Sequence, residues 1–418
     1  MKWGWLIFSV LAVVAVALLA GCSPDNLTAE TDSCMNCHSG DTTTGNAVLA
    51  AQAQYENSGH FNGPRTLSPY SDNTGHTYVF HGSNSMYTNG SNCSKCHTHQ
   101  GFVDFVAAGM PASWNQGYGA ASPPGCFTCH KPHVSGDFSM RKESSETLAD
   151  GASVFDYGKG NLCVTCHKAL TAPSGFLTSD PINWRSSSGA HHGPQADFIM
   201  GTGHWAYGAN SYQTAAANSH VSDVRQPDAC VSCHMYQPTS RLGGTLELGG
   251  HGMYLTGDVH GSNVDIVQTC KTCHTSGAPW PSSNPKFTDS GHLAPYDWDG
   301  KNGVQDKLLE IKGLRDTLIA YLGNGAANFG GAGKGPIVGE LDPLTDATSG
   351  EWNQDWQFNP VQTSLSLVIS ESFWNFKLFI EDHSGGIHNP TFAAQILYDA
   401  IDNLNDNAGT SLTLGTRP

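Results

Sequence analysis

Residues 125–133 read GCFTCHKPH and place two cysteines, Cys126 and Cys129, directly before a histidine, His130. A second histidine, His133, follows three residues later. The same Cys-x-x-Cys-His spacing occurs six times in the 418 residues and uses twelve of the thirteen cysteines. In chain order the first to sixth frames are Cys34, Cys37 and His38; Cys93, Cys96 and His97; Cys126, Cys129 and His130; Cys163, Cys166 and His167; Cys230, Cys233 and His234; and Cys270, Cys273 and His274.

The Cys-x-x-Cys-His frame is the attachment signature of c-type haem. Two thiols bind the vinyl groups of the porphyrin, and the adjacent imidazole becomes the proximal ligand of the iron. Disulfides and zinc are the alternatives for paired cysteines. Zinc sites, however, need no histidine directly after the second cysteine, and their ligand pairs do not recur in this way. The frames therefore predict six covalently attached haem c groups.

The composition narrows the possible partners and the kind of core. The formal net charge is −16, which argues against nucleic acid, because phosphates call for clustered lysine and arginine. It favours solubility and cationic partners instead. Glycine is abundant, with 48 residues, and aliphatic side chains are too few to fill the hydrophobic cores that a chain of 418 residues would need. We therefore expect many apolar side chains to pack on porphyrins.

The thirteenth cysteine, Cys22, ends an apolar run at the start of the chain. The run from Leu6 to Ala20 has 15 residues, fewer than the roughly 20 needed to span a bilayer, and it is typical of a signal sequence. Leu19-Ala20-Gly21-Cys22 resembles a bacterial lipoprotein box, which implies cleavage before Cys22 and its acylation. An ordinary signal peptide with a chance cysteine is the alternative.

Four segments are expected along the chain. Residues 1–21 form the signal peptide, 22–33 a lipidated polar tether, 34–300 a hexahaem domain of loops and short helices, and 301–418 a helical region that contributes a distal haem ligand. The predicted fold class is mainly α with extensive loop and little sheet, a multihaem cytochrome c with porphyrins in its core and long C-terminal helices.

Three C-terminal helices are predicted from apolar residues at helical spacing. The first runs from Val304 to Leu322 and stops at Gly323, and the second covers about residues 361–381. The third covers residues 390–404, with Asn389 as its N-cap and Pro390 at its first position. His388 therefore lies at a helix start although no haem frame is nearby.

Fourteen of the twenty histidines lie outside the frames and could supply distal ligands. Histidines are more often surface or core residues, but each haem iron otherwise lacks a strong sixth ligand. His133 cannot reach the far side of its own iron, because only two residues separate it from His130; it could reach a neighbouring iron or be solvated. The distal candidates are His60, His133, His191, His192, His220, His251 and His388.

From about Gly59 onward the chain resembles the pentahaem ammonia-forming cytochrome c nitrite reductases and their multihaem relatives. Four features carry the resemblance: SGHF around His60, His220 about ten residues before a frame that is followed by Met235, His251 between the last two frames, and GIHNP at residues 386–390. The resemblance implies these distal pairings: His220 with His130, His251 with His167, His388 with His234, and His60 with His274. The first frame would be an additional haem, with His133 as its preferred partner and His76, His81 and His99 as rivals.

The departures from this family concern its catalytic groups. The family's catalytic haem has lysine in place of the frame histidine, whereas the corresponding frame here ends in His97. The catalytic tyrosine is missing after the fourth frame, where the sequence reads His167-Lys168-Ala169-Leu170. The family's active-site histidine corresponds to His191 or His192, which could close the iron as a sixth ligand. An iron with two imidazoles has no vacancy for substrate.

The sequence thus favours a membrane-anchored electron carrier with bis-histidine haems over an enzyme. Its expected partners are other cytochromes, a porin–cytochrome conduit, or extracellular acceptors such as metal oxides, and its expected location is the outer membrane, on the periplasmic or cell-surface side. A terminal reductase of nitrite, hydroxylamine or a related oxyanion at the second frame is the alternative. A subunit of a conducting polymer is a third. Asp297 and Asp299 faintly resemble a calcium loop, but Lys301 occupies a ligand position, so we expect a turn there.

Overall fold

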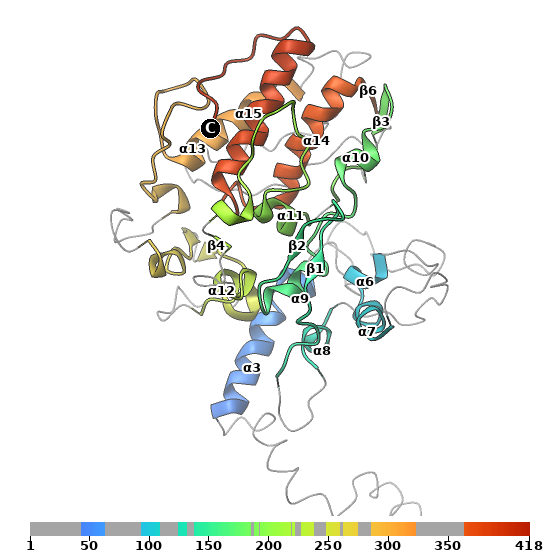
Figure 1. The fold of residues 1–418 in the computed structure, drawn as a ribbon. Helices are drawn as coiled ribbons and strands as arrows, with labels where there is room; N and C mark the ends of the chain where they lie inside the picture. The colour runs from blue at the N-terminus through green and yellow to red at the C-terminus, as the bar shows by residue number, and fades with distance from the viewer. Residues whose placement is uncertain are drawn as a thin grey trace, which may run out of the picture.

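The computed structural model describes residues 43–62, 93–108, 124–131, 138–184, 188–191, 193–218, 220–221, 227–237, 248–259, 262–274, 286–322 and 363–418. Helix and loop dominate these residues and the strands are short, which confirms the predicted fold class (Figure 1). Within these ranges no helix has the length and apolar character needed to cross a membrane. The apolar run before Cys22, the polar tether and the first frame lie outside the described residues.

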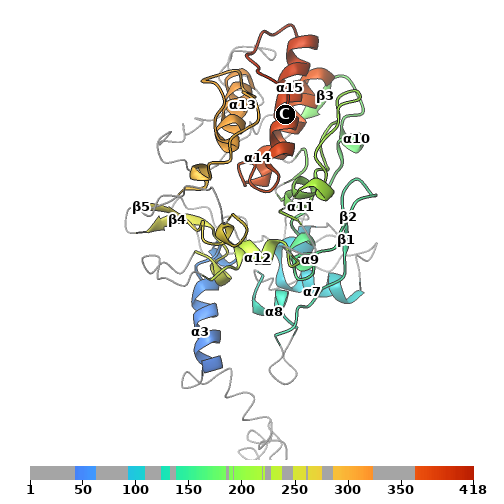
Figure 2. The same ribbon diagram turned by 60° about the vertical axis from the view of Figure 1, so that its left-hand side comes forward.

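Three long helices pack against one another at one end of the molecule (Figures 1 and 2). They are α13 (Lys307–Leu322), α14 (Leu367–Asp382) and α15 (Pro390–Asn407). All three were predicted, but two begin later than the apolar pattern indicated. The Asp306 carboxylate accepts the Leu308 N–H at 3.0 Å, and this starts α13 at Lys307. Before α14, the chain forms a strand instead of a first helical turn.

That strand, β6 (Thr363–Leu365), pairs in antiparallel register with β3 (Ile182–Trp184). At the start of α15, the Asn389 side chain accepts the Phe392 N–H at 3.3 Å and Pro390 occupies the first position, as predicted.

The largest hydrophobic core is built mainly by these helices, and buried side chains from residues 169–198 and 294–298 join it. It includes Trp298, Leu318, Trp374, Phe379 and Phe392, each of which is buried. Helix α11 (Gln195–Met200) joins this core through Phe198, whose ring lies 5.2 Å from the ring of Phe392. Two buried bonds add to this connection: Trp374 Nε1 donates to the Gly203 carbonyl at 2.8 Å, and Trp184 Nε1 donates to Ser370 Oγ at 3.0 Å.

The frame-bearing part of the chain has shorter elements and smaller apolar clusters. It contains two hairpins, β1 (Glu146–Thr147) with β2 (Val154–Phe155) and β4 (Thr256–Val259) with β5 (Ser262–Asp265). Helix α3 (Thr43–Tyr55), which the sequence pattern did not predict, packs against the short helix η3 (Gly250–Gly252). Apart from the short helical elements at the frames themselves, this part of the chain also contains α4 (Gly59–Asn62), α7 (His99–Ala108), α10 (Pro173–Phe176), η2 (Ala215–Ala217) and η5 (Phe287–Asp289).

Two leucines on α13 test the importance of the helical core. Leu318 is fully buried, whereas Leu309 is 37% exposed on the same helix. We expect Leu318→Ala to lower the free energy of unfolding by about 2–5 kcal/mol, because it leaves a cavity. The control Leu309→Ala is expected to change it by less than about 1 kcal/mol. Urea unfolding measures both values, and equal effects would contradict this assignment of the core.

Candidate haem-iron centres

The second to sixth frames each form a short helical turn. The backbone N–H groups of His130, His167 and His274 donate to the carbonyl of the first cysteine in their own frame, at 2.9, 2.9 and 2.8 Å. Residues three apart on a helical turn lie on the same side, so both cysteines of a frame can face one porphyrin edge. The helical elements are α6 (Cys93–His97), α8 (Cys126–Cys129), α9 (Gly160–Val164), α12 (Cys230–His234) and η4 (Cys270–Thr272).

Each histidine of these five frames faces a second histidine from a distant part of the sequence. The ring centres lie 6.4 Å apart for His97 and His191, 6.3 Å for His130 and His251, 6.0 Å for His167 and His60, 6.1 Å for His234 and His388, and 6.3 Å for His274 and His220.

These separations suit one iron ion between two imidazoles. A bond between a first-row metal and an imidazole nitrogen is about 2 Å long, and the nitrogen lies about 1 Å from the ring centre, so two such rings have centres about 6 Å apart. Direct stacking of the rings would bring them closer. Five separations between 6.0 and 6.4 Å therefore fit five haem centres with an imidazole on each face.

Most of these imidazoles use Nδ1 in a hydrogen bond within the protein. Such a bond sets the tautomer and leaves Nε2 as the nitrogen for iron. The partners of Nδ1 are the Phe138 carbonyl for His130 at 2.8 Å, Gln195 Oε1 for His167 at 3.1 Å, the Ile387 carbonyl for His220 at 2.6 Å, the Met253 carbonyl for His234 at 3.0 Å, Asp382 Oδ1 for His388 at 2.7 Å, and His292 Nε2 for His274 at 2.6 Å.

Burial keeps several of these rings in the neutral form that binds metal. Desolvation lowers the pKa of His60 and of His234 to about 4, and nearby histidines add to the effect. Desolvation also lowers the pKa of His167 and His220. Neutral imidazole is the ligand form of histidine, so these rings are ready to bind iron at neutral pH.

His388 is an exception, because a carboxylate lies beside it. Burial lowers the pKa of His388, but the charge and the hydrogen bond of Asp382 outweigh this and raise the pKa above its ordinary value. The Asp382 side chain is itself fully buried.

The backbone is strained next to several centres. His191 has φ = +71° and Met253, whose carbonyl binds His234, has φ = +65°. Ala229, directly before the fifth frame, has φ = +39°. Non-glycine residues in this region cost free energy and cluster at functional sites.

The structure corrects three of the four pairings that the family resemblance implied. His220 faces His274 and not His130, His251 faces His130 and not His167, and His60 faces His167 and not His274. Chain order did not predict these pairs because the frames fold back on each other, so spatial neighbours are remote in sequence. His388 does lie opposite His234, as implied.

Several predicted residues have no described position. Cys22, Cys34, Cys37, His38, His76, His81, His133 and His192 lie outside the described residues. His191, the other candidate of its pair, faces His97. His99 bonds to Thr128 Oγ1 at 2.8 Å through its Nδ1.

No sequence pattern predicted the residues that orient the imidazoles. Gln195, Asp382 and His292 lie outside any recognisable motif, and each reaches its histidine only through the tertiary fold.

Frames that are remote in sequence touch one another. The side chains of Cys96 and Cys166 lie next to each other, and Cys166 Sγ lies 3.8 Å from the Lys95 carbonyl, so the second frame meets the fourth. The side chains of Cys163 and Cys230 also lie next to each other, and this joins the fourth frame to the fifth. Thr269, directly before the sixth frame, donates to the Ser232 carbonyl of the fifth at 3.3 Å. The described frames thus form a contiguous series from the second through the fourth and fifth to the sixth.

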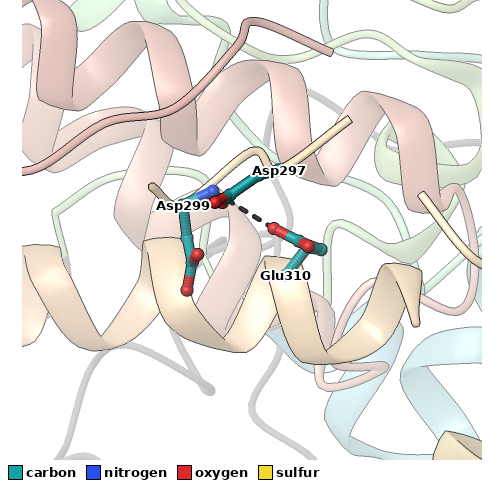
Figure 3. A group of neighbouring side chains, drawn as sticks. All are labelled: Asp297, Asp299 and Glu310. Carbon is teal, nitrogen blue, oxygen red and sulfur yellow. Dashed lines mark hydrogen bonds between the residues drawn. The ribbon is translucent and has the colours of Figure 1, made fainter. Parts of the chain in front are cut away.

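Asp297, Asp299 and Glu310 gather at the start of α13 (Figure 3), close enough to be considered for a cation. Their oxygens already accept backbone N–H groups. Glu310 Oε2 binds the Trp298 and Asp299 N–H groups at 2.8 and 3.2 Å, and Asp299 Oδ1 binds that of Lys301 at 2.7 Å. The Lys301 ammonium turns away to Thr317 Oγ1, at 2.7 Å. These bonds hold the loop as the expected turn.

Two curated relatives that match the chain are the C-type polyheme cytochrome OmcB of Geobacter sulfurreducens strain DL-1 / KN400 and that of strain ATCC 51573 / DSM 12127 / PCA. Each is 21% identical over 378 residues, a match that covers 75% of this chain and 44% of the relative. The chain therefore spans less than half the length of these relatives. No protein-family model matches the chain, and no solved structure matches it.

The frames, the facing imidazoles and this distant similarity support a multihaem c-type cytochrome with covalently bound haem c. The resemblance to nitrite reductases gains no support from these comparisons.

The carboxylate group at α13 generates a prediction about pH. Desolvation is the main cause that raises the pKa of the Asp299 carboxyl from 3.8 to about 6. The folded protein therefore holds this proton more tightly than the unfolded chain does, and the group's contribution to stability falls as pH rises from about 4 to about 6. We expect Asp299→Asn to gain thermal stability relative to wild type across this range. Unfolding midpoints that change in parallel for both proteins would contradict the prediction.

Proposed function

We propose that this protein is an electron-transfer cytochrome with six haem c groups, each with an imidazole on both faces of its iron. The observation that carries the proposal is the set of five facing histidine pairs at 6.0–6.4 Å. Haem bound in this way supplies one-electron chemistry, and axial ligands, hydrogen bonds and burial set each potential.

The facing histidines would hold the iron from both sides and leave no position for substrate. A haem held in this way would exchange only electrons. His191 is decisive here, because it faces His97 of the second frame, where the alternative reductase would work. This contact supports a carrier rather than a terminal reductase.

The contacts between frames support a path for electrons. The second, fourth, fifth and sixth frames follow one another through the contacts of Cys96 with Cys166, Cys163 with Cys230, and Thr269 with Ser232. The third frame joins through Thr128, which bonds to His99, two residues after the second frame. Attached porphyrins would therefore have close neighbours, and short distances favour fast electron hopping. For the first frame we propose His133 as the distal ligand.

Export and anchoring are part of the proposal. The apolar run that ends at Cys22 supports secretion and acylation of that residue. Each acyl-chain methylene that is buried in a membrane stabilises binding by about 0.8 kcal/mol. The partners would be other redox proteins, such as cytochromes or a porin–cytochrome conduit, or extracellular acceptors at the outer membrane.

The first experiment counts and classifies the haems of the purified wild-type protein. Intact-mass analysis should give six covalent haems, and the ferric spectrum should be wholly low-spin. The reduced protein should bind neither carbon monoxide nor nitric oxide. One high-spin iron that binds nitrite would favour the reductase instead.

The variant His191→Gly should open one iron. Glycine adopts the φ of +71° at this position without strain, so the backbone should keep its course. We expect one of the six haems to become high-spin and the reduced variant to bind one carbon monoxide per chain.

The matched control is His204→Phe. His204 packs between Tyr212 and Phe392, with ring centres at 4.1 and 5.1 Å, and it is not the ring that faces any of the five described frame histidines. Its spectrum should match wild type. If His191→Gly also stays fully low-spin, His191 is not the ligand.

Anchoring is tested separately with Cys22→Ala. In a host that matures c-type cytochromes, wild type should fractionate with the outer membrane and carry acyl mass at Cys22. The variant should lose that mass and leave the membrane fraction while retaining its haems. Equal membrane association of both proteins would refute the lipid anchor.

A further inference from the structure

The carboxylate of Asp382 distinguishes the centre at His234 and His388 from the others. Asp382 is the last residue of α14, and its Oδ1 accepts the Nδ1–H of His388 at 2.7 Å. Behind the other facing imidazoles whose Nδ1 hydrogen bonds are given above, the partners are backbone carbonyls, the amide of Gln195 and the ring of His292. Among these six hydrogen bonds, the one to Asp382 involves a carboxylate.

A local network surrounds the Asp382 carboxylate with hydrogen-bond donors. Oδ2 accepts from the Ser384 hydroxyl and from the Ser384 N–H. Ser384 Oγ in turn accepts the N–H groups of Gly386 and His388, both at 3.2 Å. The partners of the two carboxyl oxygens, Ser384 and His388, can all act as donors, as an ionised carboxylate requires because it accepts only.

Helix stability does not explain this carboxylate. Asp382 lies at the C-terminus of α14, where the helix dipole disfavours negative charge, and its side chain is fully buried. A buried charge needs compensation from hydrogen bonds or an ion pair. The imidazole of His388, together with Ser384, provides that compensation. The hydrogen bond to His388 therefore helps to explain why a carboxylate lies at this buried position.

We propose that Asp382 is a positioning and tuning residue that lowers the reduction potential of the haem attached at Cys230 and Cys233. A carboxylate that accepts Nδ1–H draws the proton toward itself and raises the basicity of Nε2. A more basic imidazole stabilises ferric over ferrous iron. The inference rests on the proposed ligation by His388, and it specifies which haem of the series the protein makes hardest to reduce by this means.

The same residue links this centre to its neighbour. The Asp382 carbonyl accepts Gln195 Nε2 at 3.2 Å, and Gln195 Oε1 accepts Nδ1 of His167 at 3.1 Å. The end of α14 therefore orients an imidazole of the fourth centre through a neutral amide and one of the fifth through a charge. This difference is the physical basis for a step in potential between two adjacent haems.

The test is Asp382→Asn in the full holoprotein, because asparagine keeps the shape and an accepting oxygen but removes the charge. We expect the ferric–ferrous equilibrium of one haem to shift at least tenfold toward ferrous, about 59 mV for one electron. Spectroelectrochemical titration measures the shift. The ferric electron paramagnetic resonance signal of one low-spin haem should change its g anisotropy at the same time.

Two further variants separate tuning from loss of structure. Asp399→Asn removes the charge of another buried carboxylate, which lies on α15 and binds Arg417 at 2.7 Å. This variant should lower the thermal midpoint and leave all the reduction potentials unchanged. Ser384→Ala removes the hydroxyl donor to Asp382, so the carboxylate should bind His388 more strongly and the potential should fall. A rise in potential in all three variants would indicate general disruption and overturn the proposal.

The outcomes distinguish this inference from the proposed function. If wild type is low-spin at all irons and the Asp382→Asn titration superimposes on it, the tuning role is wrong and the carrier stands. If wild type has a high-spin iron, the bis-imidazole proposal itself fails. If Asp382→Asn does not assemble, Ser384→Ala alone decides: a lower potential supports tuning, and an unchanged or higher one rejects it.

Discussion

Two imidazoles that share one iron must keep their ring centres about 6 Å apart, and this requirement constrains most of the chain. His60 and His167, or His234 and His388, come from segments more than a hundred residues apart, yet their rings stand at 6.0 and 6.1 Å. A shared iron would therefore cross-link two distant segments through each facing pair. Because the two cysteines of a frame would also bind the porphyrin, one such centre would hold four side chains at once.

Cohesion is divided between two parts of the protein. Helices α13, α14 and α15 bury a continuous apolar core with Leu318, Phe379 and Phe392, as an ordinary helical protein does. Around the frames, the described residues form two smaller apolar clusters and two short hairpins, and residues 169–198 add side chains to the helical core. The helical core meets the frames at the turn between α14 and α15, where Asp382 and His388 lie. A stable scaffold thus presents one imidazole to a part of the chain that depends on its cofactors.

The environments of the imidazoles differ although the frames are alike. The Nδ1 atoms of these rings have different hydrogen-bond partners: backbone carbonyls for some rings, and an amide, another imidazole or a carboxylate for others. Repeated attachment motifs with different hydrogen-bond partners allow one chain to hold similar cofactors at different potentials. The contacts between frames then determine which potentials are adjacent.

The sequence alone determined the attachment chemistry, because two cysteines and a histidine at fixed spacing form their site within one helical turn. It also predicted the C-terminal helices, since apolar periodicity and the Asn389–Pro390 cap are local signals. The partners of His130, His167 and His274 were decided only by the tertiary structure. A histidine carries no mark of the ring it will face, and three of the implied pairings were wrong for that reason. The buried carboxylate behind His388 likewise follows from the packing of a helix end, which no spacing in the chain encodes.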